Sequence, residues 1–152
     1  MLIIKPPNPV VLDGRKSIFL AGTIDNGESH DWQAEVEKKL VNQDVTILNP
    51  RREDWDSSWE QTIEDPRFKE QVEWELEGLD LADAILMYFA SDSKSPITLL
   101  ELGLYASSGK LIIVSPKGFW RRGNIEAVAS KYGIPLYQHL EDGLNYLRHL
   151  LG

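Results

Sequence analysis

A single carboxylate lies in the middle of an otherwise apolar stretch. Between Ile97 and Ala106, every residue except Thr98 and Glu101 is apolar or small. This pattern is typical of a buried helix, in which an unpaired carboxylate is strongly destabilising or takes up a proton. Glu101 is therefore a candidate catalytic carboxylate. A narrow polar stripe or an ion pair with an arginine would explain it equally well from this stretch alone.

The residues around this stretch indicate where its helix begins and ends. Pro96 suits the first helical turn, where its missing N–H removes no hydrogen bond. Ser95 is placed to cap the helix, and Gly109 is placed to end it.

Five short apolar runs alternate with helical segments and must position this carboxylate. We expect strands at 17–21, 45–48, 84–89, 111–114 and 134–137, and helices at 31–42, 65–81, 96–106, 124–132 and 140–151. The alternation predicts an α/β fold with a flavodoxin-like, doubly wound, five-stranded parallel sheet in the order 2-1-3-4-5 and helices on both faces. In the helix at 65–81, the apolar residues Phe68, Val72, Leu76 and Leu79 mark the expected buried face.

Length and composition limit the class of protein. The chain has 152 residues, which predicts one domain over 1–152, with 1–16 as an N-terminal arm. The prolines of this arm exclude a helix, and 10–12 is a candidate edge strand. The net charge of −8 argues against a nucleic-acid polymer or an anionic membrane as partner.

The sequence gives little support for thiol-based or metal-based chemistry. The chain has no cysteine, and its three histidines lack metal-ligand spacing. The acids at 54, 56, 60, 64 and 65 fit a solvated face better than a magnesium site. We therefore expect no metal and no cofactor. No segment resembles a membrane span or a signal peptide, so the cytoplasm is the expected location.

Loops at the carboxyl ends of the expected strands supply the candidate ligand crevice. These loops are 22–27, 51–59, 91–95 and 116–123. Glu101 lies about two turns into the helix that follows one of them, which places its side chain within reach of the crevice floor.

Several short motifs follow one another along the chain: 18–22 (IFLAG), Trp74-Glu75, Ala82-Asp83 before an apolar strand, 100–103 (LELG) and Gly123-Asn124. In this order and at this spacing, they resemble the nucleoside 2-deoxyribosyltransferase family. The similarity runs from about residue 17 to residue 140, and the Glu-Leu-Gly helix is its most specific part. The block at 49–55 looks like a divergent branch of that family.

The resemblance implies transfer of 2-deoxyribose between the bases of 2'-deoxynucleosides. Glu101 matches the nucleophile, which attacks C1' and forms a covalent glycosyl-enzyme, as in retaining glycosidases. Glu75 matches the acid that protonates the leaving base, although the family has an aspartate there. Asp80 and Asp83 are nearby alternatives, and a solvated helix carboxylate is the structural explanation for Glu75.

Other positions match the substrate-binding residues of the family less closely. Ser95 replaces a carboxylate that orients the sugar, and Asn124 resembles an asparagine that reaches a neighbouring subunit's sugar. A helix cap would explain either residue. Gly22 and Thr23 resemble a sugar-and-base loop, and Asp25 is a base-edge candidate. In the loop at 51–59, Asp54 is a candidate for reading a base amino group. Trp55 and Trp59 are candidates for stacking on a base, and ordinary packing would explain them equally well.

The implied partners are a 2'-deoxynucleoside, a free purine or pyrimidine base and further copies of this chain, as a dimer or hexamer with shared active sites. One alternative is hydrolysis of nucleoside 5'-monophosphates at the same glutamate, with Ser91, Ser93, Lys94 and Ser95 as the phosphate cradle. That loop has no glycine to let backbone N–H groups converge, which favours free nucleosides. A non-catalytic nucleotide-binding module is the third hypothesis.

Overall fold

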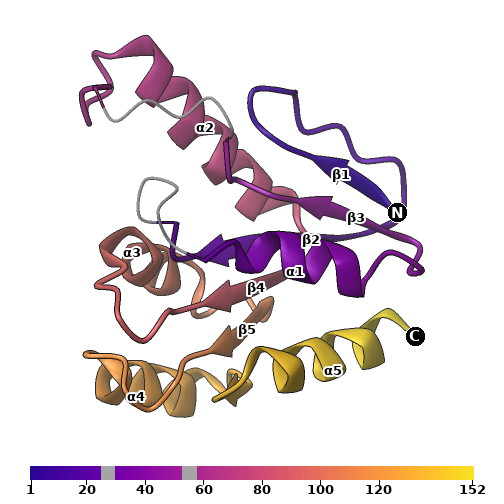
Figure 1. Ribbon diagram of the computed structural model, residues 1–152, viewed down its shortest axis with the longest axis vertical. Coiled ribbons are helices and arrows are strands. Elements are labelled where there is room, and N and C mark those ends of the chain that lie inside the picture. Colours follow the sequence, from indigo (N-terminus) through magenta and orange to yellow (C-terminus); the bar gives the residue numbers. More distant parts are fainter. Residues whose placement is uncertain (25–29, 53–57) are drawn as a thin grey trace. The chain divides into compact units, whose positions relative to one another are not determined.

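The computed structural model describes residues 1–24, 30–52 and 58–152, and the chain divides into two compact units. Unit 1 contains Met1–Leu20 and Ile24–Asp83, and unit 2 contains Ala21–Thr23 and Ala84–Gly152. Both units combine parallel strands with helices, so the predicted α/β class with a parallel sheet is confirmed (Figure 1).

Unit 1 has strand β3 at its centre. Its elements are β1 (Leu2–Ile4), β2 (Lys16–Gly22), α1 (Trp32–Lys39), β3 (Val45–Leu48) and α2 (Pro66–Leu81). Strand β3 pairs in parallel with β1 on one side and with β2 on the other. The last residues of β2 belong to unit 2. All four residues of β3 are buried, including Thr46, as is typical of a parallel strand covered on both faces.

The described residues contain six strands rather than the expected five, because unit 1 has an additional edge strand. The candidate edge strand at 10–12 was wrong, because the pairing segment is β1, where Leu2 lies opposite Thr46 and Ile4 lies opposite Leu48. β1 comes before the prolines that stop the ladder. The backbone N–H of Asn49 extends the pairing by donating to the Ile4 carbonyl.

Unit 2 has strand β5 at its centre. Its elements are β4 (Ala84–Tyr88), α3 (Pro96–Tyr105), β5 (Leu111–Val114), α4 (Arg122–Tyr132), β6 (Leu136–Tyr137) and α5 (Leu140–Leu151). Strand β5 pairs in parallel with both β4 and β6. Within each unit, the strand neighbours are those that the flavodoxin-like order requires. α4 begins at Arg122 rather than Asn124, and β6 is two residues shorter than expected.

The buried face of α2 differs from the one that its apolar spacing predicts. Leu79 is buried as expected, but Leu76 is 40% exposed. The other buried positions are Gln71, Trp74 and Gly78. A Cβ atom at Gly78 would lie 2.8 Å from Cε2 of Phe19, so the missing side chain lets α2 approach β2 closely. Gln71 lies seven residues before Gly78 on the same helical face and is buried with it.

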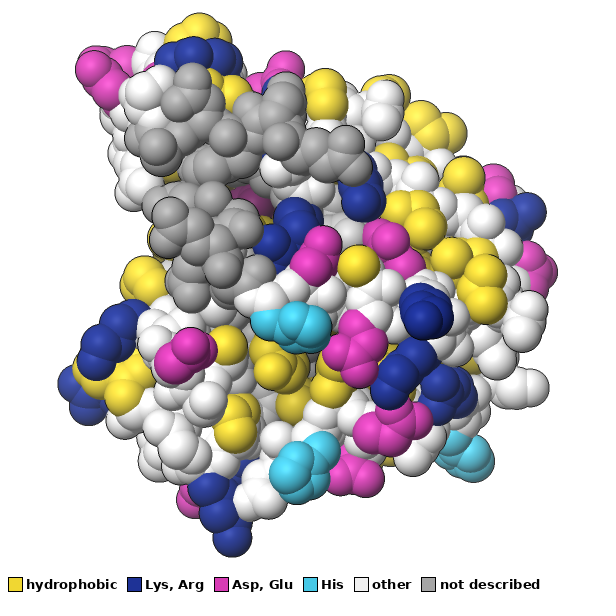
Figure 2. All heavy atoms as spheres, in the orientation of Figure 1, with side chains coloured by type: hydrophobic (Ala, Val, Ile, Leu, Met, Phe, Trp, Pro, Cys, Tyr) yellow, Lys and Arg dark blue, Asp and Glu magenta, His cyan; other side chains and the backbone are white. Residues whose placement is uncertain are grey.

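The surface carries both signs of charge. On the face shown in Figure 2, acidic and basic side chains are interspersed rather than separated into fields of one sign. Within the described ranges, every helix is too short or too polar to cross a membrane.

Candidate functional site

Helix α3 buries its polar side chains together with Leu102 and exposes three of its other apolar side chains. Ser95, Thr98 and Glu101 follow one another at a spacing of three residues, and all three are buried, with Glu101 8% exposed. That spacing places them on one helical face. On the opposite side, Ile97, Leu100 and Leu104 are 60%, 59% and 56% exposed. The expectation of a helix buried all round was wrong, and Glu101 lies on a buried polar face that extends to the helix start.

Three hydroxyl groups of unit 2 form a buried cluster at the beginning of α3. The Oγ atoms of Ser95 and Thr23 lie 2.5 Å apart, and those of Ser95 and Ser93 lie 2.7 Å apart. Thr23 is also 3.1 Å from Ser93, and its hydroxyl accepts a hydrogen bond from the backbone N–H of Ala90. The backbone N–H of Thr23 donates to the carbonyl of Tyr88, which fixes residue 23 beside the end of β4.

The number of protons in this cluster determines what Ser95 can offer a ligand. Ser93 donates its hydroxyl proton to the Ala90 carbonyl, which leaves two protons for the contacts among the three oxygens. A chain in which Thr23 donates to Ser95, and Ser95 donates to Ser93, uses both. Ser95 then has one free lone pair, so it is suited to accept a hydrogen bond from a sugar hydroxyl.

Ser95 does not cap α3 with its side chain, so that structural explanation is wrong. It occupies the N-cap position, but its hydroxyl makes no capping hydrogen bond. Its φ of 47° is the one positive value at a non-glycine position in the described ranges. A serine in this conformation is strained, and such strain is concentrated at functional sites. Here the strained backbone turns the hydroxyl toward Thr23 and Ser93.

The second carboxylate of interest, Glu75, lies on α2 in unit 1 beside a buried glutamine. The Nε2 atom of Gln71 donates to Oε1 of Glu75 at 3.0 Å, one helical turn away. Part of Glu75 reaches the surface, but its carboxyl group is crowded by protein atoms. This burial raises the pKa of Glu75 to about 7, and the hydrogen bond from Gln71 acts in the opposite direction. A carboxyl group with this pKa is suited to general acid catalysis near neutral pH.

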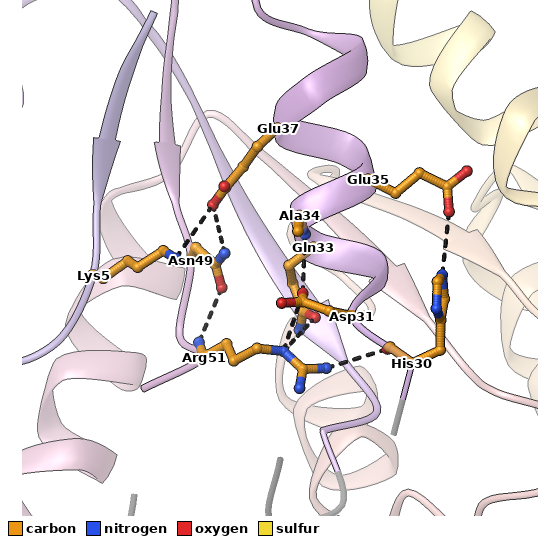
Figure 3. Close-up of polar contacts among 9 residues, drawn as sticks. All are labelled: Lys5, His30, Asp31, Gln33, Ala34, Glu35, Glu37, Asn49 and Arg51. Atoms are coloured by element: carbon orange, nitrogen blue, oxygen red, sulfur yellow. Dashed lines mark hydrogen bonds and ion pairs between the residues drawn. The ribbon is translucent and has the colours of Figure 1, made fainter. Parts of the chain in front are cut away.

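A polar network holds the segment after β3 against α1 (Figure 3). The Nε atom of Arg51 lies 3.1 Å from Oε1 of Gln33 and 3.2 Å from Oδ1 of Asp31, which caps α1. Asn49 accepts from the backbone of Arg51 and donates to Glu37. The Pro50 carbonyl within this segment accepts from Nε2 of Gln71. The network therefore fixes the backbone on which Gln71 rests.

Trp59 and Arg52 pack against each other within unit 1. The ring of Trp59 is 7% exposed, and the guanidinium groups of Arg52 and Arg67 lie 4.9 and 5.2 Å from its centroid. Arg52 also pairs with Glu70 at 2.9 Å. The packing alternative for Trp59 therefore has direct structural support.

Asp83, an alternative proton donor, has a structural role. Its Oδ2 atom accepts hydrogen bonds from both the backbone N–H and the hydroxyl of Ser17, at 2.8 and 3.1 Å. Ser17 lies near the beginning of β2, at the opposite end from Thr23. Because ligands bind at the carboxyl ends of parallel strands, these contacts place Asp83 at the wrong end of β2 for catalysis.

Of the remaining predicted site residues, two lie in other elements and three lie outside the described residues. Gly22 is the last residue of β2 and directly precedes Thr23. Asn124 is exposed within α4 and does not cap it, because Arg121 holds the N-cap position. Asp25, Asp54 and Trp55 lie outside the described residues. Within the described ranges, no three acids or histidines are arranged to hold a metal ion.

Two polar residues near these carboxylates were missed by the sequence analysis. Thr98 lies on the buried face of α3 between Ser95 and Glu101, and Gln71 contacts Glu75. The available signal was spacing: Thr98 is three residues before Glu101, and Gln71 is four residues before Glu75.

Parallel strands, helical crossovers and a buried glutamate in the helix after β4 define an α/β protein with a candidate catalytic carboxylate. The chain belongs to the nucleoside 2-deoxyribosyltransferase-like family, whose model matches residues 15–119. The matched range includes Thr23, Glu75, Ser95 and Glu101 and ends before Asn124. A comparison with curated proteins gave no match.

Proposed function

We propose that this protein transfers 2-deoxyribose from one nucleobase to another by double displacement at Glu101. The observation that carries the proposal is the buried position of Glu101 on the same face of α3 as Thr98 and Ser95. A carboxylate enclosed in this way has lost part of its hydration and is suited to attack an electrophilic sugar carbon.

The proposed reaction has two steps. A carboxylate oxygen of Glu101 forms a bond to C1' of the deoxyribose while the bond from C1' to the base nitrogen breaks. The electron pair of that bond passes to the base, which takes a proton from Glu75. A second base then attacks C1', the glutamyl ester bond breaks, and the proton of the incoming base returns to Glu75. The product retains its anomeric configuration.

The hydroxyl cluster supports free nucleosides rather than nucleoside monophosphates as substrates. A phosphate cradle needs hydrogen-bond donors, whereas Ser93 donates to the Ala90 carbonyl and the Ser95 hydroxyl contacts those of Ser93 and Thr23. Ser95 instead offers a lone pair, which matches the donor of a 5'-hydroxyl. The ammonium group of Lys94 makes a cation–π contact, 4.3 Å from the centroid of the Trp120 ring.

A base-exchange assay tests the proposal. The protein is incubated with a 2'-deoxynucleoside and a different free base, and the exchanged nucleoside is measured by chromatography. We expect exchange by the wild type and a loss of about 10³-fold or more in Glu101→Gln, with an unchanged circular dichroism spectrum. Exchange by a folded Glu101→Gln variant would overturn the proposal. Release of base from a deoxynucleotide without exchange would favour the hydrolase, and no turnover of either substrate would favour a binding module.

We also propose that the protein assembles with further copies of itself through α3. Ile97, Leu100 and Leu104 form an exposed apolar stripe on this helix. Gly103 lies on the same helix, and a Cβ atom there would have no neighbour within 4 Å. Exposed apolar residues in a continuous row are typical of protein interfaces, and they support a second copy as the partner.

A further inference from the structure

The side-chain amide of Gln71 is buried with one of its polar atoms unpaired. Gln71 is 5% exposed, and its Oε1 atom has no hydrogen-bond partner among the described residues. Buried polar atoms in native proteins are nearly always hydrogen-bonded, so an unpaired carbonyl oxygen needs an explanation. One explanation is a ligand that supplies the missing donor.

The neighbours of Gln71 determine which end of the amide is unpaired. Its Nε2 atom donates to the Pro50 carbonyl and to Oε1 of Glu75, both at 3.0 Å. In the flipped orientation, Oε1 would face the Pro50 carbonyl, which can only accept, and that hydrogen bond would be lost. The unpaired atom is therefore an acceptor, and its position is fixed from two sides.

Glu75 provides a complementary donor next to this acceptor. Because its Oε1 accepts from Gln71, Oε2 is the atom left to carry the carboxyl proton. The pKa of about 7 keeps a large share of Glu75 protonated at neutral pH. One turn of α2 thus presents an O–H donor and a C=O acceptor side by side.

We propose that Gln71 and protonated Glu75 together select a nucleobase edge at which an accepting ring nitrogen adjoins an exocyclic amino group, namely N7 and the 6-amino group of adenine or N3 and the 4-amino group of cytosine. The inference rests on the proposed function, in which Glu75 faces the leaving base. The ring nitrogen accepts from Oε2–H of Glu75, and the amino group donates to Oε1 of Gln71. Gln71 acts as a specificity-determining residue.

At the corresponding edge, oxo bases lack this pattern and are rejected. Hypoxanthine and guanine present two acceptors, N7 and O6, so O6 would face Oε1 of Gln71. Uracil and thymine present a donor at N3 and an acceptor at O4, which reverses both contacts. Each mismatch leaves buried polar groups unpaired, and such sites discriminate strongly between substrates.

Calorimetric titration with free bases tests the inference without turnover. At pH 6, we expect wild-type protein to bind adenine at least about tenfold more tightly than hypoxanthine, and cytosine at least about tenfold more tightly than uracil. Unsubstituted purine, which lacks the amino group, and 7-deazaadenine, which lacks N7, are each expected to bind more weakly than adenine. Equal affinities, a preference for the oxo bases or no binding of any base would overturn the inference.

Matched variants separate selection by Gln71 from a structural role. Gln71→Met removes the acceptor, and we expect the adenine preference over hypoxanthine to fall to within about threefold. Gln43→Met is the control, because it makes the same substitution at a half-buried glutamine of unit 1 that lies outside the polar network around Arg51. It should keep the preference. An equal loss of preference in both variants would overturn the inference. If Gln71→Met does not fold, the titrations of wild-type protein with purine and 7-deazaadenine test the inference instead.

The binding and exchange assays fail in distinguishable ways. Selective binding of adenine without any base exchange would overturn the proposed transferase function and leave base selection standing. Base exchange without a preference for amino bases would overturn the selection by Gln71 and leave the transferase function standing.

Discussion

The hydroxyl groups of Thr23 and Ser95 lie 2.5 Å apart in unit 2, although 72 residues separate them in the chain. This contact joins the end of β2 to the beginning of α3, where Ser95 adopts a φ of 47°. It directs the Ser95 hydroxyl to the buried face that also contains Glu101. The pair therefore connects the loop after the first long strand with the helix of the proposed nucleophile.

Ser95→Ala should weaken recognition of the sugar. If Ser95 accepts from the 5'-hydroxyl, its loss should raise KM for 2'-deoxynucleosides about tenfold, as expected for one hydrogen bond. Steady-state kinetics with 2',5'-dideoxynucleosides provides the control, because these substrates lack the hydroxyl and should not distinguish the variant from wild type. An equal KM increase for both substrate classes would contradict this role.

The pH profile of base exchange should reflect the protonation of Glu75. A proton donor works only in its protonated form, and burial raises the pKa of Glu75 to about 7. We therefore expect kcat to fall as the pH rises above about 7. Glu75→Gln should lower kcat by about 10²–10⁴-fold and abolish this descending limb. A wild-type profile that stays flat from pH 6 to 9 would exclude Glu75 as the proton donor.

The same carboxyl group should make stability depend on pH. The pKa of Glu75 is raised from 4.5 to about 7 in the folded protein. Below pH 4.5 the group is protonated in both states, and as the pH rises through 7 the folded state increasingly bears the cost of a buried charge. Relative to Glu75→Gln, wild type should lose roughly 3 kcal/mol of unfolding free energy between pH 4.5 and pH 8. Urea denaturation at both pH values measures this difference, and a constant difference would contradict the raised pKa.

Gly78→Ala should destabilise unit 1. The added Cβ atom would lie 2.8 Å from the Phe19 ring, so α2 or Phe19 must shift, at a cost of about 1–3 kcal/mol. Gly123→Ala in α4 is the matched control, because a Cβ atom there has no neighbour within 4 Å. We expect the control to be neutral or slightly stabilising by thermal denaturation. Equal melting temperatures for the two variants would refute the close contact.

Leu100→Asp should disrupt self-association. Leu100 is 59% exposed within the apolar stripe of α3, so a charge there leaves an isolated copy folded but cannot be accommodated in a buried interface. Sedimentation velocity should show an assembly for wild type and a monomer for the variant. Val11→Asp, at a 65% exposed site on the N-terminal arm, should leave the assembly intact. A wild type that sediments as a monomer would overturn the proposed interface.

Local patterns predicted most elements because local physics controls them. The strand at 111–114 and the helix at 140–151 have the predicted bounds, and α2 begins after Asp65, whose side chain caps it. Uninterrupted apolar runs, helical periodicity and capping residues act over a few positions. Contacts beyond that range were predicted less well: the edge strand at 2–4 replaced the expected one at 10–12.

The sequence by itself determined the α/β class, the family and the isolation of Glu101 within an apolar helix. Only the tertiary structure decided which faces of the two important helices are buried. Apolar spacing marks Leu76 as buried in α2, but the helix face that packs closely at Gly78 carries Gln71, which is buried instead. In α3, the hydroxyls of Thr23 and Ser93 hold Ser95 inward, while Leu100 and Leu104 remain exposed. Apolar periodicity does not encode a glycine contact or a hydroxyl network, because both depend on residues far away in the chain.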